Sequence, residues 1–437
     1  MQNSVFRSLR RGQMRFSVNE DGNWRAFNHK NYRIVYRANA LSNIGSWVQR
    51  IAQDWLVLEL THSGTFLGII SALQFTPFLL VSLQGGAMAD RLNKRKTLVF
   101  TNIAGGTTAL TLGLLIVTDQ VQLWHIMVMA SLVGLTDAID KPVRQSFVAE
   151  LVGTKDMPNA IGLNSANFNL GRLIGPAVSG LLIAAFGTGP AFLINSFAYI
   201  FVIMAMLRIN DEHLFKVPKA QGPTSIREGL RYVRARPDIF VTMSICFFMA
   251  TFGLNFQIFS ALMTTKTFNK GAASFGLLGT ILAIGSLSAA LFSPRLEKYR
   301  STRFVIIGAI VFSIFVFISA FMPTYTTYAI CLPFAGAAAL TTMIAANSVT
   351  QLNSDHAIRG RVMGIYQLVF LAGAPITSPL IGLSSETFGV RTTIAVCALL
   401  TLIPITFIWY RFKDAIAVPS DISISAVLET DTELPPK

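Results

Sequence analysis

Polar and ionisable side chains recur at helical spacing within an otherwise apolar stretch near the start of the chain. Between residues 34 and 60 they are Asn39, Asn43, Ser46, Arg50, Gln53 and Asp54. At about 100° per residue these positions fall on one narrow face of a helix. Arg50 and Asp54 are spaced i, i+4 and can form an ion pair. Such a face can contact a polar ligand or exchange a proton, or it can hold a structural ion pair that fastens the helix to a neighbour.

A second group of charges follows the same spacing later in the chain. Its members are Asp137, Asp140, Lys141 and Arg144. Each acid has a base four residues later, which favours ion pairs on one helical face, although Pro142 disturbs the turn. We expect these pairs either to break and re-form as a gate beside Asp90 and Arg91 or to anchor their helices permanently. Arg172, inside a later apolar stretch, is a third candidate, either for the gate or cavity or for a structural pair.

Uncharged polar residues and helix-bending residues complete the candidate site. The polar ones are Asn255, Gln257, Asn347, Tyr366 and Gln367. Each can line a cavity or form an ordinary hydrogen bond between helices. The helix-bending ones are Gly175, Pro176, Gly180, Pro375 and Pro379. They provide either a flexible gate or close helix packing with tolerated kinks.

Motifs for covalent chemistry are absent from the sequence. It has no G-x-x-x-x-G-K-[ST] phosphate loop, no H-E-x-x-H and no G-x-S-x-G. The five histidines form no cluster, and the three cysteines have no metal-ligand spacing. We therefore expect no enzyme activity, no metal and no cofactor.

The composition indicates a membrane protein. Hydrophobic residues make up 52% of the 437 residues and charged residues only 13%, whereas a soluble domain carries about 25% charged residues. A soluble enzyme, a nucleic-acid-binding domain and a disordered protein are all excluded on this ground. Twelve stretches are long and apolar enough to cross a bilayer as helices. They are residues 34–60, 65–88, 97–118, 121–140, 160–186, 189–208, 238–262, 272–293, 304–322, 326–348, 362–385 and 391–411.

Lysine and arginine set the predicted orientation. With the N-terminus in the cytoplasm, the inner segments hold 31 of these residues and the outer loops hold 3. Such a bias places both termini in the cytoplasm. The expected fold is an all-α membrane protein with twelve transmembrane helices in two six-helix bundles.

The longest inner connection divides the chain. We predict a cytoplasmic arm over 1–33, a six-helix bundle over 34–208, a linker over 209–237, a second six-helix bundle over 238–411 and a cytoplasmic tail over 412–437. The linker contains a short basic amphipathic helix, which we expect to lie at the inner headgroups.

The two halves are weakly alike in sequence. The matching dipeptides are Gly175-Pro176 with Ala374-Pro375 (offset 199), Phe186-Gly187 with Phe388-Gly389 (offset 202) and Glu150-Leu151 with Gln351-Leu352 (offset 201). Three matches at nearly one offset indicate a duplicated half. Parallel repeats of this kind place a substrate site between the halves, near the middle of the membrane.

The segment after the second predicted span carries a recognisable motif. Its residues Gly86, Asp90, Arg91, Lys94 and Arg95 resemble the loop 2–3 signature of the major facilitator superfamily, G-x-x-x-D-R-x-G-R-[RK]-x-x-L. The second glycine of the signature is an asparagine here, and asparagine also tolerates a left-handed backbone.

Further runs are similar to one branch of that superfamily, which includes the enterobactin exporter and macrolide and multidrug efflux proteins. They are residues 41–56, 163–176 and 359–364. The resemblance implies a secondary active exporter of a small organic molecule, a siderophore or a drug-like compound, working by proton antiport with alternating access. Asp54 would carry or regulate the coupling proton. A lipid flippase, a sensor or scaffold that does not transport, and an importer remain alternatives.

The resemblance also implies a location and partners. We expect a multi-pass monomer in the bacterial inner membrane, in contact with membrane lipids, the small-molecule substrate and protons, and with no nucleic acid.

Overall fold

The computed structural model describes residues 24–91, 93–216, 226–355 and 358–417, and within them the backbone is almost entirely helical, without strands. The first group of helices, preceded by a 3-10 turn (Arg25–Asn28), comprises α2 (Lys30–Thr61), α3 (Gly64–Arg91), α4 (Lys94–Val117), α5 (Leu123–Phe186) and α6 (Gly189–Leu207). The second group comprises α7 (Ile226–Ala235), α8 (Pro237–Phe248), α9 (Phe256–Leu262), α10 (Ala272–Phe292), α11 (Thr302–Ala320), α12 (Tyr325–Leu352), α13 (Arg359–Ala372), α14 (Ala374–Thr387) and α15 (Val390–Ala417). The all-α fold class is confirmed.

Ten helical segments of the described chain are long and apolar enough to span a membrane. One of them, α5, has 64 residues, which is about three times the length that a bilayer core requires. Gly153 interrupts it with a φ of 73°, so α5 consists of two arms that match two predicted spans. The polar helix α2, which is not among the ten, contains the first predicted span. Each of the twelve predicted stretches therefore coincides, to within about two residues at its ends, with a helical segment or lies inside a segment or arm.

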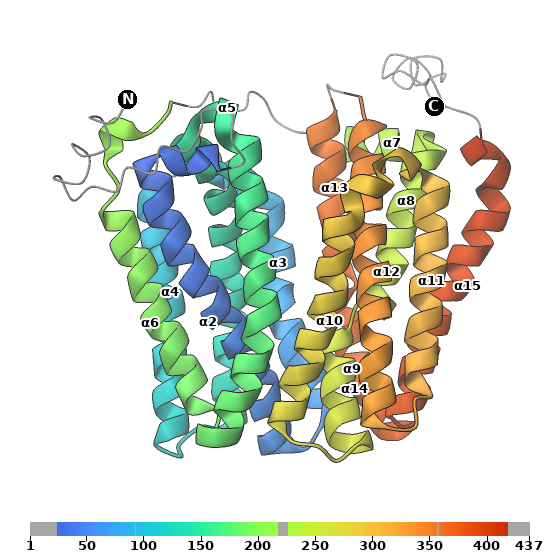
Figure 1. Ribbon diagram of the computed structural model, residues 1–437, viewed down its shortest axis with the longest axis horizontal. Helices are drawn as coiled ribbons and strands as arrows, with labels where there is room; N and C mark the ends of the chain where they lie inside the picture. Colours follow the sequence, from blue (N-terminus) through green and yellow to red (C-terminus); the bar gives the residue numbers. More distant parts are fainter. Residues whose placement is uncertain (1–23, 92, 217–225, 356–357, 418–437) are drawn as a thin grey trace, which may run out of the picture.

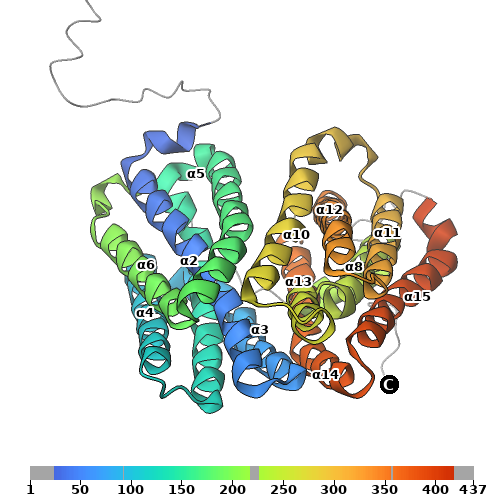
Figure 2. The ribbon, with the colours of Figure 1, turned by 60° about the horizontal axis from the view of Figure 1, so that its bottom comes forward.

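The helices form two groups side by side (Figure 1), α2–α6 in one and α7–α15 in the other. The start of α2, the helix α7 and the end of α15 lie at the same end of the molecule, which we call the α7 end. The opposite end, which comes forward in Figure 2, we call the distal end. Because α2 starts and α15 ends at the same end of the molecule, the chain crosses from end to end an even number of times.

The predicted linker helix forms, as α7, and packs on α13. Arg361 of α13 pairs with Glu228 of α7 at 2.6 Å. The hydroxyl of Tyr232, which is 2% exposed, accepts a hydrogen bond from the backbone N–H of Asp355. These contacts attach α7 to the second group; its placement at the headgroups remains a prediction.

Glycines join the two groups at the distal end, where α3 lies along α14 and α5 lies along α10 (Figure 2). A Cβ atom added to Gly68 would overlap the carbonyl of Ser378, and one added to Gly276 would overlap the carbonyl of Pro176. Gly180 and Gly382 occupy corresponding places in the two contacts. Because any side chain would separate these helices, the glycines permit main-chain contact between the groups. We call the two contacts the glycine seams.

The glycines also support the predicted duplication. Gly187 and Gly389 end α5 and α14 with φ values of 75° and 86°, a region that favours glycine. They are 202 positions apart, and so are Gly180 and Gly382 of the seams. The same turn and the same close contact therefore recur in both halves.

A helix is interrupted next to the predicted bending residues in one half only, and Gly373 at that interruption still has helical φ and ψ values. The backbone of α5 keeps helical φ and ψ values at Gly175, Pro176 and Gly180, and leaves them only at Gly153. In the other half, α13 ends at Ala372 and α14 begins at Ala374, next to Pro375. Pro379 lies inside α14, where its backbone lies against Gly68 of α3 and supports the seam.

Candidate functional site

A cavity of about 670 Å³ lies between the two groups of helices. Helices α2 and α5 supply its wall on one side, and α9, α10, α12 and α13 supply most of the other. Its apolar lining includes Trp47, Phe256, Phe275, Met343 and Phe370. Its polar lining consists of Arg172, Gln257, Ser260, Ser286, Asn347, Ser348, Tyr366 and Gln367. A mostly apolar wall with a few polar groups is typical of sites for small organic ligands.

Four of the five uncharged residues predicted for the cavity lie in its wall: Gln257, Asn347, Tyr366 and Gln367. Asn255 is not among the lining residues, and its predicted role in the pathway stays a prediction. Its side-chain amide donates to the carbonyls of Thr251 and Phe252, at 2.9 and 3.2 Å. The π-helical segment Met249–Gly253 interrupts the helix just before Asn255, so the amide bonds its own backbone instead of facing the cavity.

Among the described residues that line the cavity, Arg172 is the one that is charged. It is half-buried, and no carboxylate of the described side chains pairs with it. The structure therefore places Arg172 in the cavity wall. It forms no ion pair with a described acid, and it does not belong to the cluster of Asp137, Asp140, Lys141 and Arg144 on α5.

A small recess of about 30 Å³ adjoins the cavity and holds Arg50 and Asp54. Gln257 lines both spaces, and its side-chain amide donates a hydrogen bond to a carboxylate oxygen of Asp54. This bond links α2 in the first group to α9 in the second. The predicted Arg50–Asp54 ion pair does not form in the structure, although both side chains line the recess. The guanidinium of Arg50 lies over the rings of Trp47 and Phe75, 5.8 and 5.6 Å from their centres, and stays close enough to the carboxylate of Asp54 to act on it electrostatically.

The remaining polar residues of α2 face other helices instead of the cavity. Asn39 accepts a hydrogen bond from Arg144, and Asn43 lies against Gly171 of α5. Gln53 is 5% exposed and lies outside both spaces. They do not line the cavity in this conformation, and their place in the substrate pathway stays a prediction. A polar face of about 120° is wide enough to meet two neighbouring helices as well as a cavity.

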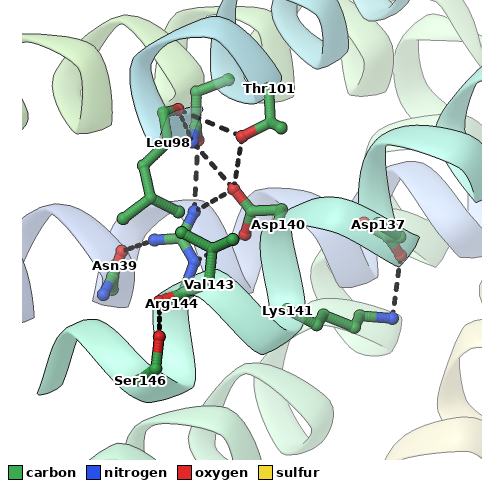
Figure 3. A network of polar contacts seen from close by, with 10 residues as sticks. Asn39, Leu98, Thr101, Asp137, Asp140, Lys141, Val143, Arg144 and Ser146 are labelled. Atoms are coloured by element: carbon green, nitrogen blue, oxygen red, sulfur yellow. Dashed lines mark hydrogen bonds and ion pairs between the residues drawn. The ribbon is translucent and has the colours of Figure 1, made fainter. Parts of the chain in front are cut away.

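The predicted pair Asp140–Arg144 is confirmed as the centre of a network near the α7 end (Figure 3). Two guanidinium nitrogens of Arg144 donate to the Asp140 carboxylate at 2.7 and 3.0 Å. Arg144 also donates to Asn39 at 2.5 Å. Asp140 accepts from Thr101 at 2.7 Å and from Asn102 at 3.1 Å. The network joins α2, α4 and α5 within one group, as an anchor does.

Two residues of this network, Thr101 and Asn102, were missed from the sequence. They are adjacent polar residues within the third apolar stretch, and both are buried. Polar residues inside an apolar stretch also identified the candidates of the first stretch. The same criterion could have found Thr101 and Asn102, because buried polar groups need hydrogen-bond partners.

The other predicted pair, Asp137–Lys141, also forms, with an oxygen–nitrogen distance of 2.8 Å (Figure 3). It is more exposed, and the Lys141 ammonium also lies 4.9 Å from the centre of the Phe78 ring of α3. Exposed pairs of this kind contribute little to stability and separate easily.

The loop 2–3 motif is described in part. Lys94 pairs with Glu150 of α5 at 2.6 Å. Arg95 donates to the carbonyls of Met206 and Leu207, both at 2.7 Å. Gly86, Asp90 and Arg91 lie within α3, but their side chains are outside the described part. The described contacts tie α4 to α5 and α6 in the same group; a gating role of the motif stays a prediction.

We expect replacement of Arg144 by Met to destabilise the protein by about 3 kcal/mol, since it leaves the mostly buried carboxylate of Asp140 unpaired. Lys141→Met, which breaks the exposed pair, should cost less than about 1 kcal/mol. The midpoint of thermal unfolding in detergent measures both. Similar losses in the two variants would show that the Asp140–Arg144 network is not an anchor.

Comparison with known proteins decides the family. A family model described as "transmembrane secretion effector", of the major facilitator superfamily, matches residues 21–426. The chain belongs to this family. The resemblance found in the sequence is confirmed, and this effector is a membrane transporter, not an enzyme.

Two relatives and one solved structure illustrate the similarity. The chain is 25% identical to the staphyloferrin A transporter of Staphylococcus aureus over 387 residues, covering 86% of the chain and 95% of the relative. It is 25% identical to the multidrug efflux pump Tap of Mycolicibacterium fortuitum over 376 residues, covering 82% of the chain and 90% of the relative. The fold is similar, with a TM-score of 0.73 and 14% identity, to a bacterial homologue of the human lysosomal transporter Spinster, over 90% of this chain and 98% of that one.

Proposed function

We propose that this transmembrane secretion effector exports a small organic molecule from the bacterial cytoplasm by proton antiport. The observation that carries the proposal is the cavity of about 670 Å³ between the two groups of helices, mostly apolar but with polar groups at a few points. A lining of this kind suits an organic molecule with some polar groups. Relatives that transport a siderophore or pump drugs support the class of substrate.

The direction of opening follows from the predicted orientation. The lysine and arginine bias assigns the α7 end to the cytoplasm. The glycine seams then lie on the outer side, where Glu386 of α14 also accepts hydrogen bonds from Ser63 and Thr65 beside the start of α3. The cavity extends toward the cytoplasmic side as far as Asn347 and Gln367. We infer that an exporter would load its substrate in this conformation, in which the seams are closed.

We infer that the substrate is released outside when the seams part and the cytoplasmic side closes. Each predicted six-helix bundle would move as one body, and a monomer suffices because both walls of the cavity belong to one chain. The anchoring network around Arg144 would keep α2, α4 and α5 together during this motion.

Asp54 is the proposed proton carrier. It is an acid in the outer part of α2, and its carboxylate bonds to Gln257 across the boundary between the groups. A proton that binds to or leaves Asp54 therefore changes a contact that joins the two groups. Movement of one proton through 100 mV supplies about 2.3 kcal/mol, which can drive useful accumulation.

The test compares the metabolites secreted by cells with and without the protein, and repeats the comparison after an uncoupler has collapsed the proton gradient. We expect at least one organic compound to be secreted only when the protein is present and the gradient is intact. Secretion at full rate after the collapse would refute the antiport, and identical secretion by both strains would refute export.

A further inference from the structure

In the described part of the chain, a single residue carries the charge of the cavity wall. Twenty-one of the 22 lining residues are uncharged, and the remaining one is Arg172. An ionised guanidinium within the membrane costs several kcal/mol unless water or an anion compensates it. The cavity wall therefore carries a positive charge that no described acid balances.

The acids of the surrounding helices are engaged elsewhere. Asp54 accepts from Gln257 in the recess, and Asp140 is held by Arg144 and Thr101. Asp137 pairs with Lys141. Glu59 of α2 is exposed, and no acid among the described side chains forms an ion pair with Arg172. Its partner is therefore expected to come from the ligand.

We propose that the transported molecule is an organic anion whose carboxylate, or an equivalent oxyanion, binds to Arg172. The guanidinium presents parallel N–H donors that match the two oxygens of a carboxylate. Asn347 and Gln367 offer further donors to the polar part of the molecule, and the aromatic residues Trp47, Phe256 and Phe275 accommodate its organic body. This assignment rests on the proposed export function and names the class of its substrate.

Binding is tested without transport, on the purified protein, with two dyes of the same three-ring skeleton and opposite charge: fluorescein, an anion, and rhodamine 123, a cation. We expect the protein to bind fluorescein at least about tenfold more tightly, the size of one charge-assisted contact. Arg172→Gln should lose that preference. Arg172→Lys keeps the positive charge but lacks the parallel N–H donors of the guanidinium, so it should retain part of the preference. Arg295→Gln removes an exposed cation outside the cavity and serves as the matched control.

Several results would overturn the assignment. The first is that the unmodified protein binds the two dyes equally, or binds neither. The second is that Arg172→Gln binds fluorescein with unchanged affinity. Thermal unfolding adds a readout that does not depend on a dye. Removal of an unpaired charge from the cavity should leave the unfolding temperature of Arg172→Gln equal or higher, whereas loss of a structural ion pair would lower it.

The same dyes separate this inference from the export proposal. Inside-out vesicles that contain the protein are supplied with a proton gradient, and fluorescein uptake is followed. If fluorescein binding depends on Arg172 but the gradient drives no fluorescein uptake, the anion site stands and the antiport is refuted. Gradient-driven uptake of rhodamine 123 alone would support the antiport and overturn the anion site.

Discussion

Asp54→Asn is expected to abolish gradient-driven export while leaving exchange of substrate across the membrane intact. Asparagine is nearly the same size as aspartate, and its carbonyl can still accept the hydrogen bond from Gln257, so the contact between α2 and α9 persists. It cannot bind or release a proton. With one proton moving through 100 mV, coupling supports roughly a 50-fold concentration ratio, and this ratio should fall to equality in the variant.

The measurement uses vesicles loaded with substrate, with and without a pH difference across the membrane. Counterflow exchange at equal pH reports that Asp54→Asn still folds and alternates between its states. Glu59→Gln, an exposed acid further along the same helix, is the matched control and should accumulate substrate normally. If Asp54→Asn keeps both its transport rate and its pH dependence, Asp54 is not the proton carrier.

Gly276→Val is expected to hold the distal end open and to stop export. The added Cβ would overlap the carbonyl of Pro176, and the new side chain would also face Gly180, both of them main-chain neighbours that cannot rotate away. Overpacking of this kind costs about 1–3 kcal/mol, enough to shift an equilibrium between two conformations roughly five- to 150-fold. The penalty applies only when the seam is closed, so the open form gains population.

Accessibility from outside the cell measures this shift. Ser260 lines the cavity and can be changed to cysteine in a chain whose three buried cysteines are replaced. A thiol reagent that does not cross membranes should then label Gly276→Val much faster than the parent. Gly162→Ala is the control, because a Cβ there has no atom within 4 Å. Equal labelling of all three would show that the glycine seam does not control access.

The sequence predicted the helices well because their signals are local. Long apolar stretches, the amphipathic pattern of α7 and the i, i+4 spacing of Asp140 and Arg144 depend on neighbours along one helix, and all three appear in the structure. The lysine and arginine count predicted an even number of crossings, consistent with the shared end of α2 and α15 (Figure 1).

The partners across helices could not be predicted in the same way. Arg50 and Asp54 have ideal spacing for an ion pair. In the structure, however, the guanidinium lies over the rings of Trp47 and Phe75, and the carboxylate accepts a hydrogen bond from Gln257. The choice depends on which helix packs against α2, and spacing within α2 carries no information about that. Arg172 was ambiguous for the same reason, because only the packed structure reveals that its neighbours are already engaged.

The distal seams have one more consequence, for the effect of voltage. Glycine main chains meet there, and they contribute no ionised group to either contact. An electric field across the bilayer therefore does no work on the parting of these surfaces themselves. A response of the cycle to membrane voltage must act through ionised groups outside the glycine contacts, such as Glu386 beside one seam and Arg50, Asp54 and Arg172 further in.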